Sequence, residues 1–172
     1  MARKERIFVK TTYMYDLQKL KEDAALKKPE WKRFYEKNLH RLKKMDIEIQ
    51  HLNDEVFEEI DCLQCGNCCR SLGPMILEKD IDGMAKSLRM KSSDFMAKFL
   101  RKDEDNDWVF QQMPCPFLGN DNYCAIYENR PKACREYPHT DRKKFHQIYN
   151  LSIKNAETCP IVFRVLEKLK EL

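Results

Sequence analysis

The stretch DCLQCGNCCRS, residues 61–71, places four cysteines within eight positions. Four more follow at wider spacing, so that the full set is Cys62, Cys65, Cys68, Cys69, Cys115, Cys124, Cys134 and Cys159. In a reducing compartment, a set of this size favours metal binding over disulfides, although the even count keeps a disulfide framework as the alternative. All eight cysteines are therefore candidate metal ligands.

The spacing of the first group fits two kinds of metal centre. CLQC followed by Gly66 resembles the turn of zinc sites with four cysteine ligands, where a residue with positive φ keeps the turn tight. Adding Cys68 gives C-x-x-C-x-x-C, the spacing with which ferredoxins hold an iron–sulfur cluster, completed by a remote Cys-Pro. Two such pairs exist, Cys115-Pro116 and Cys159-Pro160. Zinc and iron, including an iron–sulfur cluster, both remain open.

Cys69 directly follows Cys68, and neighbouring side chains are expected to point apart. The two thiols then belong to two adjacent sites or to one polynuclear cluster, and eight thiolates divide naturally into two sets of four. The sequence thus predicts more than one metal ion. We expect Cys159 to return to the first cysteine group, and we expect most of a second group to consist of Cys115, Cys124 and Cys134.

The segments CLQCGNCC, CPFL and CAIYENRPKACREYP together resemble the YkgJ-type cysteine-cluster family, whose signature is C-x-x-C-x-x-C-C. The resemblance covers about residues 60–160, and the residues before 60 fall outside it. It implies a domain that chelates zinc or iron. A related cysteine cluster occurs in flagellin lysine methylase, which makes protein-lysine methylation an analogy only.

Arg130 and Arg135 flank Cys134 and are predicted to donate to thiolates or to offset their charge, as partners behind metal ligands do. The alternative for each arginine is a salt bridge to Glu128 or Glu136. Aromatic residues and a proline of the same segment are predicted to pack around the site and exclude water: Tyr127, Tyr137 and Pro138. Of the histidines, His139 and His146 are weaker ligand candidates, and His40 and His51 are expected on the surface.

The elements that position these residues are predicted to be mostly helical. Residues 1–60 form a predicted N-terminal helical element, with a long helix from Pro29 at its first turn. Its apolar stripe follows helical spacing: Trp31, Tyr35, Leu42, Met45, Ile49, Leu52 and Val56. Packing of this stripe on its own domain is favoured over a coiled-coil dimer.

Residues 61–172 form the predicted cysteine-cluster domain, and the length of the chain predicts that it folds as a single compact unit. Two short helices are expected between residues 75 and 100, the second capped by Ser92 or Ser93. DWVFQQMPCPF is predicted to be a strand, and LGNDNYC a turn that leads to a second strand. Helices close the chain, the last with Pro160 in its first turn. The fold class is α+β, mostly helical, with an irregular centre organised by metal and a short β-hairpin.

Composition excludes several classes of function. The net charge of +4 is too small to indicate nucleic acid. No segment has the length of a membrane span, and the N-terminus lacks the apolar core of a secretion signal, so a cytoplasmic protein is expected. No nucleotide-binding or hydrolase motif is present, which disfavours an enzyme and leaves any catalytic residue unknown. The predicted function is metal storage, delivery or sensing. The alternatives are an iron–sulfur enzyme or electron carrier, and a structural zinc module whose N-terminal helix binds an unknown protein partner.

Overall fold

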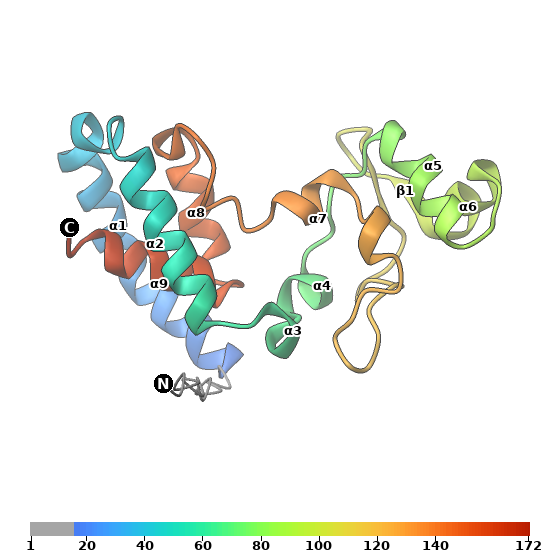
Figure 1. The fold of residues 1–172 in the computed structure, drawn as a ribbon, viewed down its shortest axis with the longest axis horizontal. Coiled ribbons are helices and arrows are strands. Elements are labelled where there is room, and N and C mark those ends of the chain that lie inside the picture. The colour runs from blue at the N-terminus through green and yellow to red at the C-terminus, as the bar shows by residue number, and fades with distance from the viewer. Residues whose placement is uncertain (1–15) are drawn as a thin grey trace, which may run out of the picture.

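The computed structural model describes residues 16–172, which form nine α-helices, two 3₁₀ helices and one two-stranded sheet (Figure 1). This confirms the mostly helical α+β class with a long N-terminal helix, α1 (Leu17–Leu42). Residues 1–15, where the sequence predicts no secretion signal, lie outside this range. Among the helices of residues 16–172, none is both long enough and apolar enough to cross a membrane.

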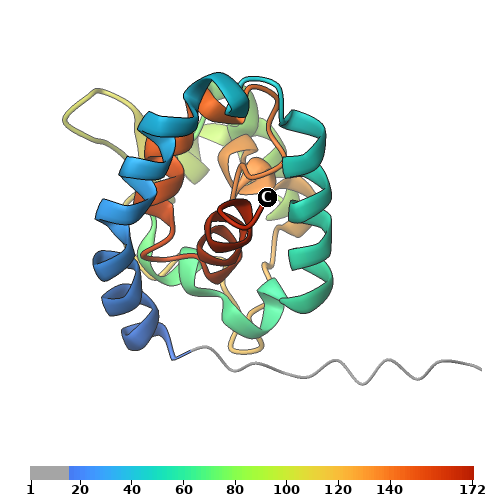
Figure 2. The ribbon, with the colours of Figure 1, turned by 90° about the vertical axis from the view of Figure 1, so that its left-hand side faces the viewer.

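The first of two lobes, the helical lobe, comprises residues 16–60 and 140–172. It contains α1, α2 (Asp46–Glu59), η2 (Phe145–Gln147), α8 (Tyr149–Asn155) and α9 (Pro160–Leu169). Helix α9 lies in the middle of this lobe, with α1 and α8 on one side and α2 on the other (Figure 2). The apolar stripe predicted from the sequence is buried against α8 and α9 of the same chain. Packing on the protein's own core is therefore confirmed for this stripe.

The stripe is carried by two helices, whereas the sequence suggested one. Residues 43–45 form a turn between α1 and α2, and Leu42 and Met45 on either side of it are both buried. Pro29 lies inside α1 and not at its first turn, which Asp16 caps by accepting hydrogen bonds from the amides of Gln18 (3.0 Å) and Lys19 (3.1 Å). Burial of apolar residues on both sides of Pro29 offsets the hydrogen bond that this residue cannot make.

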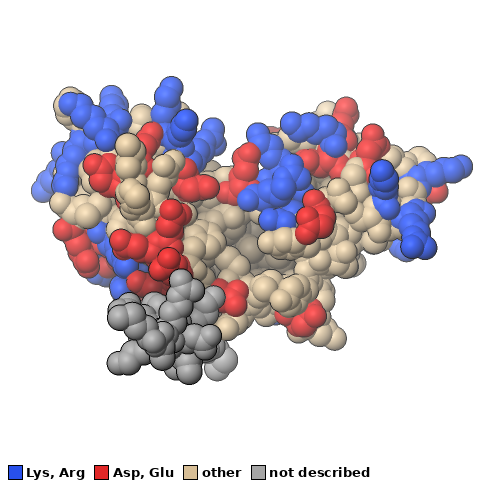
Figure 3. All heavy atoms as spheres, viewed as in Figure 1, with Lys and Arg blue, Asp and Glu red and all other residues tan. Residues whose placement is uncertain are grey.

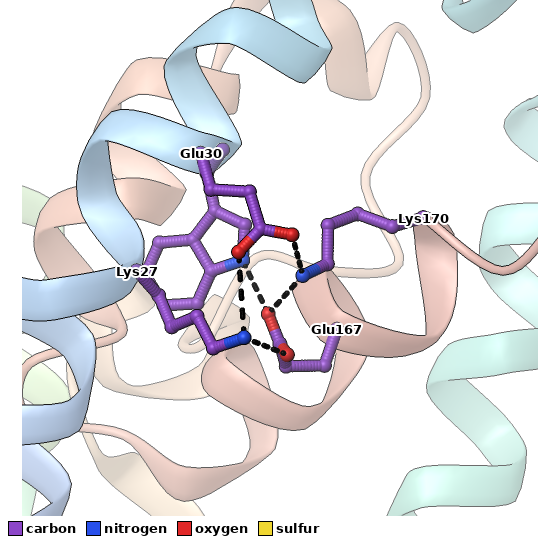
Figure 4. Close-up of polar contacts among 5 residues, drawn as sticks. Lys27, Glu30, Glu167 and Lys170 are labelled. Atoms are coloured by element: carbon purple, nitrogen blue, oxygen red, sulfur yellow. Dashed lines mark hydrogen bonds and ion pairs between the residues drawn. The ribbon is translucent and has the colours of Figure 1, made fainter.

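A polar network ties α1 to α9 (Figure 4). Lys170 Nζ lies 2.6 Å from Glu30 and 2.8 Å from Glu167, and Lys27 Nζ lies within 3.4 Å of both carboxylates. The indole N–H of the fully buried Trp31 donates to Glu167 at 2.8 Å. Because Trp31 has no exposed surface, this carboxylate supplies its partner inside the lobe.

The second lobe, the hairpin lobe, comprises residues 72–131. Helices α5 (Glu78–Ser87) and α6 (Ser92–Phe99) are the two short helices that the sequence predicts. The predicted cap is wrong, because Lys91 precedes α6 and Ser92 is its first helical residue, with its hydroxyl donating to Asp82 at 2.5 Å. These helices enclose a small core of Ile76, Ile81, Met84, Phe95, Leu100, Phe110, Phe117 and Ile126.

The β-hairpin exists, but its strands differ from those predicted. Strand β2 (Trp108–Phe110) pairs antiparallel with β1 (Leu100–Lys102), which precedes it directly after α6. After the turn LGNDNYC, an isolated bridge between Leu118 and Cys124 takes the place of the predicted second strand. The turn closes on itself, with the amide of Gly119 donating to the carbonyl of Tyr123 at 2.7 Å, and this leaves no length for a strand.

Three short helices lie between the lobes: α3 (Cys62–Cys65), α4 (Asn67–Ser71) and α7 (Lys132–Glu136) (Figure 1). The chain leaves the helical lobe at residues 60–61 and returns to it at residues 137–140, after the hairpin lobe with its 3₁₀ helix η1 (Tyr127–Asn129). Helix α9 begins at Pro160 as predicted, whereas α8 begins only at Tyr149, after the 3₁₀ turn η2.

Candidate metal centre

All eight cysteines line one cavity of about 690 Å³ between the two lobes, and all eight are free thiols. They come from α3, α4, α7, the loops after β2, and the residue before α9. The charged members of the cavity wall are Arg130, Arg135, Glu136 and Asp141, and the surface between the lobes is correspondingly poor in charge (Figure 3). Cys62 is exposed at the rim and Cys159 is buried.

The turn that holds the first two thiols has the predicted geometry. Asp61 caps α3 by accepting from the amide of Leu63 at 2.9 Å, and the amide of Gly66 donates to the carbonyl of Cys62 at 2.9 Å. Gly66 has φ 55°, the left-handed conformation that the spacing predicts. A Cβ atom at this position would lie 2.6 Å from Nη1 of Arg70 and 3.0 Å from Oδ1 of Asn122. Glycine is therefore favoured by the backbone angle, and a larger residue would have to displace the side chains of Arg70 and Asn122.

Arg70 and Asn122 are the neighbours that sequence reasoning missed. The guanidinium of Arg70 donates to the carbonyl of Cys65 at 2.7 Å and also to Oδ1 of Asn122. The amide of the Asn122 side chain donates in turn to the carbonyl of Leu63 at 2.6 Å. Burial raises the pKa of Cys65, and the positive charge of Arg70 offsets part of this effect. Arg70 directly follows Cys68 and Cys69 in the sequence, and a cation at this position was the available signal. Asn122 lies 52 positions further along the chain, and no spacing rule predicts its contact with Arg70.

The sulfurs of Cys68 and Cys69 lie 4.0 Å apart, so the two side chains do not point away from each other as expected. At this separation one thiol can hydrogen-bond to the other, which lowers the pKa of Cys69 and raises that of Cys68. Helix α4 presents both sulfurs to the same cavity. The two thiols therefore face the same cavity together and do not point into two separate sites.

The pKa of each thiol is affected by charge at its neighbours, and these neighbours indicate which thiols lie close together. The pKa of Cys68 is raised by its hydrogen bond with Cys69, by burial, and by negative charge at Cys159 and Cys62. The pKa of Cys159 is raised by burial and by negative charge at Cys62 and Cys65. The pKa of Cys134 is raised by burial and by negative charge at Cys69, Cys115 and Cys124.

Charge at Cys69 also acts on Cys62, Cys65 and Cys68, so Cys69 lies between the two groups. We place Cys69 in the second group because its carbonyl accepts from the amide of Cys115, and we call the groups the first set (Cys62, Cys65, Cys68, Cys159) and the second set (Cys69, Cys115, Cys124, Cys134). The position of Cys159 agrees with the expected partition, and the use of these sets as ligands stays a prediction.

Most of these thiols hold their protons tightly. Burial raises the pKa of Cys115 to about 11 and that of Cys134 and Cys159 to about 12. Partial loss of water around its sulfur raises the pKa of Cys62 to about 11, although the residue as a whole is exposed. Metals bind the thiolate form, so an incoming ion must displace these protons, and its affinity depends on pH.

The two predicted arginines both lie at the cavity wall, but they do not pair with Glu128 or Glu136 among the described contacts. Arg135 lies 3.5 Å from the buried carboxylate of Asp80, which also accepts from the amide of Lys132 at 3.1 Å and so fixes the start of α7. Arg130 stacks over the ring of Tyr127, with its guanidinium carbon 3.7 Å from the ring centre. Asp80 links the hairpin lobe to the helix that carries Cys134.

The hydroxyl of Tyr137 is buried and lacks a hydrogen-bond partner among residues 16–172. Burial raises its pKa, and negative charge at Cys159 and Cys68 raises it further. This hydroxyl therefore stays protonated and can donate a hydrogen bond to the neighbouring thiols of the first set. His139 also lines the cavity, and burial lowers its pKa, whereas His146 is not part of the cavity wall. His40 and His51 are exposed as expected.

The chemistry of the eight thiols fits zinc or iron, but their spacing in this structure is wide. Across the described part of the chain, no three cysteine, histidine, aspartate or glutamate side chains converge closely enough to hold one ion. Zinc–sulfur bonds are about 2.3 Å long. Metal binding therefore requires the thiols to come closer together, by rotation of their side chains or by movement of the cavity walls.

No significant match was found among curated proteins or among solved structures. The family model described as "CxxCxxCC: Putative zinc- or iron-chelating domain" matches residues 61–160, a range that includes every cysteine and more than half of the chain. This match confirms the resemblance to the YkgJ-type cysteine-cluster family. The chain therefore belongs to the CxxCxxCC family of zinc- or iron-chelating domains.

Proposed function

We propose that this protein holds zinc or iron through all eight cysteines, in the two sets defined above, and that it stores, delivers or senses this metal. The observation that carries the proposal is that eight thiols from distant parts of the chain line a single cavity. Structural zinc sites enclose their ion fully. Here Cys62 is exposed at the rim, which favours a metal that can be exchanged with a partner or with a small chelator.

The chain's own residues support the gathering of negative charge in this cavity. Arg70 lies beside Cys65 and Cys69, and the charge of Arg130 favours the thiolate forms of Cys124 and Cys134. The hydroxyl of Tyr137 can donate a hydrogen bond to a thiolate of the first set. The thiolates of both sets would hold the ion, which would supply positive charge in the cavity. We place the protein in the cytoplasm, where reductants keep such thiols free.

An iron–sulfur cluster is the second candidate, and the 4.0 Å separation of the Cys68 and Cys69 sulfurs favours it. Two thiolates this close can serve neighbouring irons of one polynuclear cluster, which fits the C-x-x-C-x-x-C spacing. An electron carrier or an iron–sulfur enzyme would then be the function.

One measurement separates these candidates. Protein purified without oxygen is examined for colour, zinc, iron and inorganic sulfide, and its metal is then offered to a chromophoric chelator. Colourless protein whose zinc transfers within minutes supports storage or delivery, and a brown protein with sulfide supports the cluster. Zinc that transfers only on unfolding identifies a structural module, and protein without bound metal overturns the proposal.

A further inference from the structure

The two lobes are connected by little besides the cavity that separates them. Among the described residues, every pair of helices or strands in extensive contact belongs to a single lobe. Their hydrophobic cores are separate, one formed by α1, α2, α8 and α9 and the other by α5, α6 and the hairpin. The chain crosses between them only at residues 60–61 and 137–140. Nothing in the packing of the cores fixes the distance between the lobes.

The segments that carry most of the thiols are fastened to the hairpin lobe. The amide of Cys115 donates to the carbonyl of Cys69 at 2.8 Å, and Asn122 donates to the carbonyl of Leu63 at 2.6 Å. Asp80 holds α7 in the same way, through the amide of Lys132. With the bond from Arg70 to Asn122, the hydrogen bonds from α3 and α4 to the hairpin lobe outnumber the one that α4 makes to the helical lobe, so we expect α3, α4 and α7 to move with the hairpin lobe.

On the opposite wall, Cys159 is the single cysteine carried by the helical lobe among residues 16–60 and 140–172. Close to it, the side chain of Asn67 in α4 donates to the carbonyl of Thr158 at 2.8 Å. Tyr137 packs against the helical core from the returning chain. These are weak ties for two bodies of this size, since a single hydrogen bond contributes about 1 kcal/mol.

We propose that the first set acts as a metal-dependent clamp between the lobes, in which an ion held by Cys159 and by the thiols of α3 and α4 draws the lobes together. This inference depends on the proposed function, because it needs metal at these thiols. It rests on two observations. No three ligand side chains among residues 16–172 converge on one point, and Cys159 comes from the helical lobe whereas its three partners come from α3 and α4. The second set lies within the body that moves with the hairpin lobe, so its occupation leaves the distance between the lobes unchanged.

The test measures distance and metal content in the same samples of the full chain. Donor and acceptor dyes are attached to clickable amino acids at the exposed positions Lys37 in α1 and Ala97 in α6, because the cysteines must stay free. Reduced, metal-free protein is then titrated with zinc alone or with ferrous iron alone. Energy transfer should rise and its distribution should narrow as metal binds, and the radius of gyration from X-ray scattering of unlabelled protein should fall. Bound metal with unchanged energy transfer overturns the clamp but leaves the proposed function intact, whereas failure to bind either metal overturns the function itself.

Two substitutions in the first set and one in the second locate the effect. Cys159→Ser and Cys62→Ser should each abolish the metal-induced approach, and Cys62 is the safer site because it is exposed and its replacement leaves the helical core untouched. Cys124→Ser is the matched control, and it should lose metal while keeping the approach. Normal approach in both first-set variants, or its loss in Cys124→Ser alone, overturns the clamp.

Discussion

At Gly66 the chain adopts φ 55°, and the space beside its Cα is filled by Arg70 and Asn122. In Gly66→Ala, the left-handed angle costs about 1–2 kcal/mol, and the new methyl group displaces the guanidinium from the carbonyl of Cys65. We expect weaker zinc binding and a lower melting temperature. Competition with a chromophoric chelator measures the affinity.

Gly73→Ala is the control for this substitution. A methyl group added at Gly73 would have no atoms within 4 Å other than those of its chain neighbours, and the φ angle of this residue is not positive. This variant should bind zinc as the parent does. Equal affinities in the two variants would show that the turn at Gly66 does not position the thiols.

Arg135 stands between the buried Asp80 and the wall beside Cys134. Arg135→Ala leaves the Asp80 carboxylate without its cation, loosens the start of α7, and should weaken metal retention about tenfold or more. Arg135→Lys should restore part of the loss, since the charge survives without the planar guanidinium. Metal retention is measured by dialysis against a chelator, with the exposed Arg101 replaced by alanine as control. Parent-like retention in both Arg135 variants would make this arginine an ordinary surface residue.

At the scale of the elements, the ion pairs that join α1 and α2 to α9 should make the helical lobe sensitive to acid. A hydrogen bond from Lys170 lowers the pKa of Glu30, and one from Lys168 lowers that of Glu59. A carboxyl group with a lowered folded pKa stabilises the fold above its unfolded value, about 4.3, and this contribution is lost as the pH falls through the folded value.

The urea midpoint of metal-free protein should therefore decrease between pH 6 and pH 3. Metal-free protein is used so that protonation of thiolates does not contribute. In a Glu30→Gln, Glu59→Gln double variant, the midpoint should change less over the same range. An identical decrease in parent and double variant would assign the acid sensitivity to other groups.

Some helices and strands could be predicted from the sequence, and others could not. Pro160 and the apolar spacing after it predict α9 correctly, because a proline at the first turn is a local signal. The turn at residues 43–45 was missed, since the apolar stripe continues through it without a glycine or proline. The three residues of β1 are mostly polar and follow a helix directly, so that only their pairing with β2 identifies them as a strand.

At the scale of the whole molecule, the eight thiols were identified from the sequence, and the cavity that gathers them is a tertiary feature. Local spacing places Cys62, Cys65 and Cys68 together, whereas the approach of Cys159 depends on the packing of α9 between α1, α8 and α2. That packing also crosses residue 60, where the sequence suggested a boundary between an N-terminal element and the cysteine-cluster domain.

Removal of metal should act unequally on the two lobes. Structural zinc contributes about 10–16 kcal/mol in small peptides, more than the whole stability of many domains. Chelation should loosen α3, α4 and α7, whose short helices have few buried residues, while the helical lobe keeps its own core. Hydrogen exchange followed by mass spectrometry should show faster exchange in residues 61–71 and 132–139 than in α1 or α9. Equal acceleration in both regions, or none, would contradict this expectation.

The helical lobe is built from segments that lie far apart in the chain, and this determines the order in which the protein can fold on the ribosome. Helices α1 and α2 are synthesised about 100 residues before α9, an interval of about 5–20 s at ordinary rates of translation. During this time the hairpin lobe and every cysteine of the second set have already emerged, while the apolar stripe of α1 and α2 still lacks its cover. Proteolysis of ribosome-bound chains of increasing length should show protection of residues 72–131 before that of α1. We therefore expect the nascent protein to capture metal at the second set first and to complete the first set only when α9 docks.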